Sequence, residues 1–391
     1  HLASEWVTDL VWRWLQDSKP GRRVVVIDVD DESLAQVGPW SWPRATLAQL
    51  ISRLDDAGVA IKLLDVTFPD QREGSDELSQ ALKGAHHESA SPSVLGQVFA
   101  LRHESTLQVG SPVGALPGEG CLGAAVPGQG VIANAAGLHS VAGHISPVID
   151  ADGVVRKVPA VVCYAGRNYP ALAVAGLAAL GGEPPRIEPN PDLRGPAWQL
   201  RLDAALPGLP VGLDKQGLMR VPFRVSRSAF ASVSASEILQ GKAPASLLKG
   251  SVVLIGASAF GLSDVVPTAL GAAVSGTEVH AQLLVGMLEG RVPHTPQAAW
   301  LVQAGAAGVL GLVLIALSSG KPLHQRRRVV LLPLMGLAGA LALFACHAAA
   351  LAWFDIYISW AQPALGVLLV GTALGISEPA RSLHVKDRLY E

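Results

Sequence analysis

Acidic residues at the ends of apolar strands are the first candidates for chemistry in this chain. Residues 23–30 (RVVVIDVD) begin as a buried strand, and residues 60–68 (AIKLLDVTF) form a second one. A helix predicted over residues 44–57 lies between them, as in a parallel β-α-β unit, where ligands bind beyond the carboxyl ends of the strands. A third strand, 251–256, leads into a Gly/Ser loop. The candidate ligand-binding residues are therefore Asp28, Asp30, Arg44, Asp65 and Asp264.

These residues allow two other interpretations, of which the first stays open and the second fails. The acids and Arg44 could pair with one another and only fix loops. Asp28-Val-Asp30 also matches a phosphatase pattern, in which the first Asp is a nucleophile and the second an acid/base beside Mg²⁺. That chemistry needs a Lys, which no position supplies at a suitable spacing, and Glu32 stands where Thr or Val is usual. We therefore predict no catalytic residue, no metal and no cofactor.

The elements that must position these residues suggest an α/β fold. We predict a mixed, partly parallel sheet flanked by helices, with two hairpins that share the pattern Asp-x-x-Gly-x-x-Arg and in which local Asp–Arg pairing is favoured. Residues 84–137 show no readable pattern, and residues 183–198 read as a Pro-rich linker. The predicted helices are 75–82 (capped by Ser75 or Asp76), 169–180, 232–239 and 276–288, and the hairpins are 145–162 and 209–223.

The three cysteines predict no disulfide framework. Cys121 and Cys163 fall in the water-soluble part and Cys346 in an apolar run. A disulfide between Cys121 and Cys163 is chemically allowed outside the cytoplasm. Their spacing does not place them together, so separate thiols are favoured.

Composition excludes some classes of partner. The chain has 391 residues and a net charge of −2, which gives no field that would attract nucleic acid. Half of its residues (50%) are hydrophobic, and the excess lies in the last hundred. The first 290 or so can therefore form an ordinary water-soluble domain.

Three apolar runs close the chain, at residues 298–319, 329–350 and 356–376. None contains Asp, Glu, Lys or Arg, and each approaches the length needed to cross about 30 Å of hydrocarbon as a helix. Small residues four apart, such as Ala304 with Gly308, favour close helix packing. We therefore predict three transmembrane helices.

The basic residues predict how these helices are oriented. The loop 320–328 carries four cations, the turn 351–355 carries none, and Arg381, Lys386 and Arg388 follow the third run. Cytoplasmic loops are the basic ones, so 320–328 and the C-terminus should be cytoplasmic and the preceding domain outside.

The N-terminal segment, residues 1–19, should lie beside the membrane. Trp6, Trp12 and Trp14 alternate with acids, which is typical of an amphipathic helix at a membrane surface. It is too polar to span. Because an exported domain must be led across the membrane, we expect a membrane helix before His1.

An ordered set of motifs resembles the CHASE type 2 (CHASE2) sensor domain over about residues 20–292. Three membrane helices after the domain are also the family's usual arrangement. The motifs are Val-Val-Ile-Asp28, Trp40-x-Trp-Pro-Arg44, Leu-Asp65-Val-x-Phe, Asp152-Gly-x-x-Arg156, Leu-Lys-Gly250-x-Val-Val-Leu-Ile-Gly256-Ala-Ser and Gly276-x-Glu-Val-His280-Ala-Gln.

The resemblance implies a receptor of the bacterial inner membrane. Residues 20–292 would be its periplasmic sensor domain, which detects a small molecule or a protein, and residues 377–391 would begin a cytoplasmic output module, a cyclase or a kinase. The chain itself would not be an enzyme. The implied partners are the lipid bilayer and a second copy of the chain. The alternative is a membrane-anchored assembly protein whose outer domain docks a partner.

Overall fold

The computed structural model describes residues 2–17, 23–85, 90–101, 105–262, 265–319 and 325–387. The chain divides into two units, which we describe separately. The sheet unit is Trp12–Pro191 with Pro196–His294, and the helical unit is His1–Val11, Asp192–Gly195 and Thr295–Glu391.

An eight-stranded sheet forms the centre of the sheet unit, and five of its strands run parallel side by side. β17 comes from late in the chain and inserts between β1 and β2, so the two predicted acidic strands are not neighbours. The strand order is β16 (Ala231–Ser234), β1 (Val24–Val29), β17 (Val252–Ala257), β2 (Ile61–Leu64), β3 (Ser93–Ala100), β6 (Gly130–Ile132) and β4 (Gln108–Val109), and β7 (Ala142–His144) also pairs with β3.

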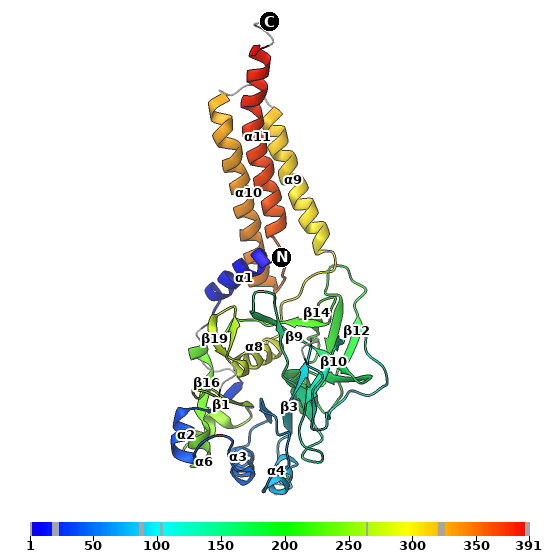
Figure 1. The fold of residues 1–391 in the computed structure, drawn as a ribbon, viewed down its shortest axis with the longest axis vertical. Helices are drawn as coiled ribbons and strands as arrows, with labels where there is room; N and C mark the ends of the chain where they lie inside the picture. Colours follow the sequence, from blue (N-terminus) through cyan, green and yellow to red (C-terminus); the bar gives the residue numbers. More distant parts are fainter. Residues whose placement is uncertain are drawn as a thin grey trace. The chain divides into compact units, whose positions relative to one another are not determined.

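Helices cover both faces of this sheet (Figure 1). Side chains of a strand alternate between faces, so Val25 and Ile27 of β1 pack on one face while Val26 and Asp28 point to the other. The first face carries α2 (Asp31–Val37), α3 (Arg44–Asp56), α4 (Ser75–Leu82) and α6 (Ala235–Leu239); the second carries α5 (Leu172–Gly181) and α8 (Gly276–Leu288), and the short α7 is Ala245–Leu248.

The main core lies between β1, β17, β2, β3 and α3. Leu47, Leu50, Ile51 and Leu54 recur at helical spacing along α3 and are at most 3% exposed. Burying each such side chain contributes about 1.5–3 kcal/mol. This packing holds the carboxyl ends of the parallel strands in fixed positions.

Three smaller sheets complete the unit. Their strands come largely from the region between β7 and α8, and η1 is Arg227–Ala229. They are β5 (Val126–Pro127), β10 (Val161–Tyr164) and β11 (Arg167–Pro170); β12 (Arg186–Pro189), β13 (Trp198–Arg201) and β14 (Val211–Leu213); and β8 (Val148–Ile149), β9 (Val155–Pro159), β15 (Leu218–Arg220), β18 (Val265–Thr268) and β19 (Gly271–Ser275).

Several sequence predictions are confirmed, and some are wrong. The helices predicted at 44–57, 75–82 and 276–288 and the strand at 251–256 all form. Neither Ser75 nor Asp76 caps α4, because Gly74 is the capping position and supplies no side chain. The supposed linker 183–198 contains β12, and the segment 84–137 holds the central strand β3.

The two Asp-x-x-Gly-x-x-Arg hairpins behave differently. In the first, Arg156 pairs locally with Asp150 and Asp152, each at 2.8 Å, as predicted. In the second, Asp214 accepts from Lys157 of β9 at 2.9 Å, a residue of the first hairpin. The second segment is also no two-stranded hairpin, since β14 pairs with β13 while β15 pairs with β9.

Cys121 and Cys163 form a disulfide with a Cα–Cα distance of 5.5 Å, so the prediction of separate thiols is wrong. Gly128 donates its backbone N–H to the Cys163 carbonyl, and β10 pairs with β5 next to it. These contacts bring the two cysteines together, and the sequence around either one does not reveal them.

The helical unit consists mainly of α9 (Ala299–Ser319), α10 (Gln325–Phe354) and α11 (Ala361–Asp387). Among the described residues, two segments are long and apolar enough to cross a membrane, Ala299–Ser318 and Val330–Phe354, whereas the apolar part of α11, Ala361–Ile376, is shorter. The helices differ in extent from the predicted apolar runs. The second helix extends beyond 329–350 at both ends and includes Arg326–Arg328, and the third begins at Ala361 rather than at residue 356.

The polar side of α1 (Leu2–Trp14) is buried. Within the helical unit, Tyr357 donates to buried Glu5 at 2.9 Å and Thr8 bonds His347 at 3.1 Å. Trp6, on the opposite side, is 73% exposed. The segment is therefore amphipathic as predicted, but its apolar side is the exposed one.

Candidate functional site

The sheet unit contains a cavity of about 770 Å³ at the carboxyl ends of its parallel strands. Asp65 and Val66 follow β2, Val98 to Ala100 end β3, and Ala257 ends β17. The first turn of α8 closes the same space with Gly276, Thr277 and His280. Its volume is in the range of sites that hold small organic ligands, about 300–1,000 Å³.

Asp65 is the polar centre of the cavity. Its side chain is 10% exposed, it accepts a hydrogen bond of 2.7 Å from the Thr277 hydroxyl, and it lies 4.0 Å from Nε2 of His280. A Cβ on Gly256 would lie 2.1 Å from the Thr277 hydroxyl. Only glycine at position 256 therefore lets α8 approach the sheet closely enough for this contact.

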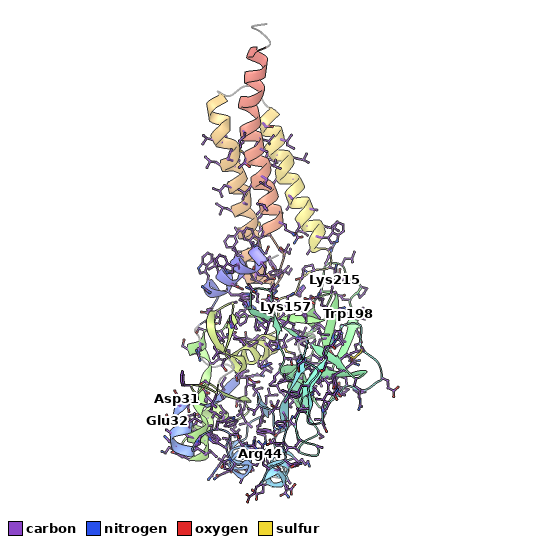
Figure 2. All side chains as sticks on the ribbon, in the orientation of Figure 1. Asp31, Glu32, Arg44, Lys157, Trp198 and Lys215 are labelled. Carbon is purple, nitrogen blue, oxygen red and sulfur yellow. A yellow bond between two sulfur atoms is a disulfide. The ribbon has the colours of Figure 1, made fainter. Side chains whose placement is uncertain are left out.

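The remaining walls of the cavity are mostly apolar. Phe99 lies on β3, Trp40 comes from the loop before α3, and Gly123 and Ala125 follow Cys121. Trp198 of β13, labelled in Figure 2, supports Gly123 from behind, since a Cβ there would lie 2.9 Å from its indole ring. The disulfide thus anchors one wall of the cavity.

Electrostatics at this end of the sheet are set by burial. His144, at the end of β7, is fully buried; desolvation first, and the neighbouring charge of His280 second, lower its pKa to about 3. His144 is therefore neutral near pH 7. Asp65 lies at the start of α8, where the helix dipole favours a negative charge.

A second, smaller cavity of about 140 Å³ lies beside the first and shares Thr277 with it. Its acids are Asp28, which accepts from the Ser258 backbone at 2.9 Å and hydroxyl at 2.5 Å, and Glu278, 3.6 Å from Arg227. Burial raises the pKa of both carboxyls. At this volume the space suits an ion or a few waters more than an organic ligand.

The sequence-predicted site residues do not gather at one place. Asp65 lines the large cavity and Asp28 the small one. Asp30 instead caps α2, accepting from Ser33 N–H at 2.8 Å and from the Ser234 hydroxyl at 2.9 Å.

Two further predicted residues complete this comparison. Arg44 pairs with Asp70 at 3.2 Å and lies over the Phe68 ring at 4.3 Å, and Figure 2 shows it at the far end of the sheet unit from Lys157. Asp264 lies outside the described residues. Arg44 and Asp30 thus act within loops and caps in the structure, whereas ligand binding by Asp28 and Asp65 stays a prediction.

Thr277 and His280 belong to the cavity but were not predicted as site residues. Both lie in the helix predicted over 276–288, and a His four residues into a helix that follows a strand is the only local signal. Their contact with Asp65 joins positions more than 200 residues apart, 212 for Thr277, which no sequence pattern reveals. In the described part of the chain, no three His, Cys, Asp or Glu residues are placed to hold a metal ion.

Comparison with known proteins gives one match. The CHASE2 domain matches residues 2–319, which is most of the chain and includes both cavities and α9. No curated protein and no solved structure matches the chain.

Proposed function

The chain belongs to the CHASE2 family, and from this premise we propose that it is the sensing and membrane part of a bacterial transmembrane receptor. CHASE2 is an extracytoplasmic sensor domain of signal-transduction receptors and not a catalytic one. In our proposal the sheet unit lies in the periplasm and binds a signal. The membrane helices pass the change to a cytoplasmic output module, a cyclase or a kinase.

The observation that carries this proposal is the 770 Å³ cavity around Asp65. It lies where ligands bind in parallel α/β sheets, and it combines apolar walls with a few polar groups. The Cys121–Cys163 disulfide supports a periplasmic location, because disulfides persist in oxidising compartments.

The apolar helices support membrane anchoring. α9 and α10 are long enough to span, and we propose that α11 spans as a third helix. Arg326–Arg328, in the first turns of α10, support a cytoplasmic location for that end, because cytoplasmic loops are the basic ones. Trp300 near the start of α9 and Trp353 near the end of α10 are 61% and 75% exposed, as expected of residues at the outer interface.

α8 offers a route from the cavity to the membrane. Its first turn holds Thr277 against Asp65, and ten residues, 289–298, connect its last residue, Leu288, to the start of α9 at Ala299. A ligand that favours one arrangement of the first turn therefore shifts the conformational equilibrium of α8, and the connected membrane helices respond to that shift. We propose that two copies of the chain form the receptor, as the family resemblance implies.

A chimeric receptor tests this function. An adenylate cyclase domain is fused after Glu391, and cyclic AMP production is measured in membranes. Ala125→Trp, which fills the cavity, should change the output at least two-fold. Leu180→Trp, on the exposed side of α5, should leave it unchanged. Equal output from both variants, with both folded, would contradict sensing through this cavity.

A further inference from the structure

We propose that α1 is an interfacial helix whose apolar face binds the outer leaflet of the lipid bilayer. The sequence predicts only that residues 1–19 lie beside a membrane. The structure assigns the face of α1 that enters the lipid and the contacts that hold it there. This rests on the proposed membrane anchoring of the helical unit and adds a lipid-binding surface to it.

The exposed side of α1 is apolar throughout the part that belongs to the helical unit, which ends at Val11. Its exposed residues there are Leu2, Ala3, Trp6 and Leu10. Leu2, Trp6 and Leu10 follow one another at four-residue spacing, so they form one ridge along the helix, and each is at least 42% exposed. A helix that faces water has its polar side outward and its apolar side buried. α1 has the inverse arrangement, so its outer face suits an apolar environment.

Hydrogen bonds fix the opposite side of α1 to the connection between α10 and α11. The Ser4 hydroxyl bonds the Ser359 hydroxyl at 2.7 Å and accepts from the backbone N–H of Ala361 at 3.1 Å. Tyr357 donates to Glu5 at 2.9 Å. Rotating α1 to hide its apolar ridge would break these bonds, so the helical unit itself keeps the ridge facing outward.

This connection marks the membrane surface in the proposed receptor. The apolar segment Val330–Phe354 ends just before it, and α11 begins just after it, at Ala361. Trp353 and Phe354, at that end of α10, are both exposed, and Trp rings concentrate at membrane–water interfaces. The contacts with residues 357–361 therefore hold α1 at the depth of the lipid headgroups.

A lipid surface fits this face better than a second copy of the chain does. A stable interface between two proteins buries about 800 Å² and about 20–30 residues on each side, whereas the ridge offers three large side chains. A bilayer sets no such requirement, because an interfacial helix buries only its apolar face among the lipids. The two acids in this part of α1, Glu5 and Asp9, are buried on the other side, so neither faces anionic headgroups.

Quenching from the lipid and from water tests this placement. Single cysteines are introduced into the full chain in a Cys346→Ala background, labelled with an NBD maleimide and placed in phosphatidylcholine nanodiscs, one copy per disc. The labelled positions are Trp6→Cys, Leu2→Cys (which keeps Trp6), Val309→Cys halfway along α9 and Lys215→Cys in the turn before β15. The quenchers are a nitroxide near the headgroup end of the lipid chains, a nitroxide at the far end of the chains, and iodide in the water.

We expect the Trp6→Cys and Leu2→Cys labels to lose at least two-fold more fluorescence to the shallow nitroxide than to the deep one, and to resist iodide. Lys215→Cys should respond to iodide alone, and Val309→Cys should respond most to the deep nitroxide. Iodide quenching of Trp6→Cys equal to that of Lys215→Cys, or no quenching of it by either nitroxide, would overturn the interfacial placement even with Val309→Cys in lipid. If neither nitroxide reaches Val309→Cys, the proposed membrane anchoring fails as well.

Discussion

His144 shows at the scale of one residue how this domain depends on pH. It is fully buried at the end of β7, and its pKa of about 3 lies well below the ordinary value of 6.5 because burial disfavours the charged ring. Between these two pKa values, His144 binds a proton in the unfolded chain but not in the folded chain. The stability that neutral His144 contributes is fully present above pH 6.5 and is lost as pH falls from 6.5 toward about 3.

This gives a defined pH effect. Between pH 7 and pH 5 the single proton should lower the free energy of unfolding of the sheet unit by about 2 kcal/mol. His144→Leu should remove that part of the pH dependence, and urea titrations of the full chain and the variant at both pH values measure it. Other groups titrate alike in both proteins and cancel. If the two proteins show the same loss, the burial of neutral His144 is not the cause.

Residue-level patterns in the sequence identified one part of the candidate site. Asp65 could be predicted because it ends an apolar strand, and it does line the cavity. Asp30 carries the same signal, yet the structure uses it to cap α2, and Arg44, which was predicted from the loop before α3, forms an ion pair. A carboxylate after a strand can serve either purpose, and only the contacts made by distant segments decide which.

At the scale of elements, amphipathic helices could be predicted and long-range strand pairing could not. α3 and α8 were found from their spacing and flanking residues, whereas β3 was missed. The polar Gln97 interrupts β3, but it is fully buried because it exchanges hydrogen bonds with the Val113 backbone at 3.0 and 3.2 Å. Likewise, the local sequence around β17 does not show that it lies between β1 and β2.

The disulfide should stabilise the sheet unit and the cavity wall. Its cysteines are 42 positions apart, so loop entropy alone predicts about 4 kcal/mol of stabilisation. The double variant Cys121→Ala/Cys163→Ala should lose about that much free energy of unfolding in urea. Cys346→Ala, which removes the free and exposed thiol of α10, serves as the control. Equal stability of all three proteins would show that the disulfide does not constrain the fold.

Glycines should determine how closely α10 and α11 approach. A Cβ on Gly371 would lie 2.8 Å from the Leu332 carbonyl oxygen, whereas one on Gly308 of α9 would have nothing within 4 Å. Gly371→Ala should therefore separate the helices and destabilise the helical unit. Gly308→Ala should be neutral or gain about 0.5–1 kcal/mol from helix propensity. Unfolding of both variants by SDS in mixed micelles measures this, and equal effects would contradict the close approach.

At the scale of the whole molecule, the two units have different roles in the proposed receptor. The sheet unit holds the cavity, and the helical unit carries the apolar segments that can anchor it in a membrane. The chain passes between the units at four points, after Val11, Pro191, Gly195 and His294. In the proposed receptor, the change that a bound signal causes leaves the sheet unit through these connections, and α8 lies just before the last of them. Variants near α8 should therefore affect output more than variants of the same size elsewhere.

The orientation of the chain in the membrane tests the central claim most directly. In a Cys346→Ala background, Lys215→Cys in the turn before β15 and, separately, Gln325→Cys at the start of α10 are exposed in intact cells to a maleimide that cannot cross membranes. The account predicts labelling of Lys215→Cys in intact cells and labelling of Gln325→Cys only after the membrane is opened. Labelling of Gln325→Cys from outside, or protection of Lys215→Cys, would contradict an extracytoplasmic sensor.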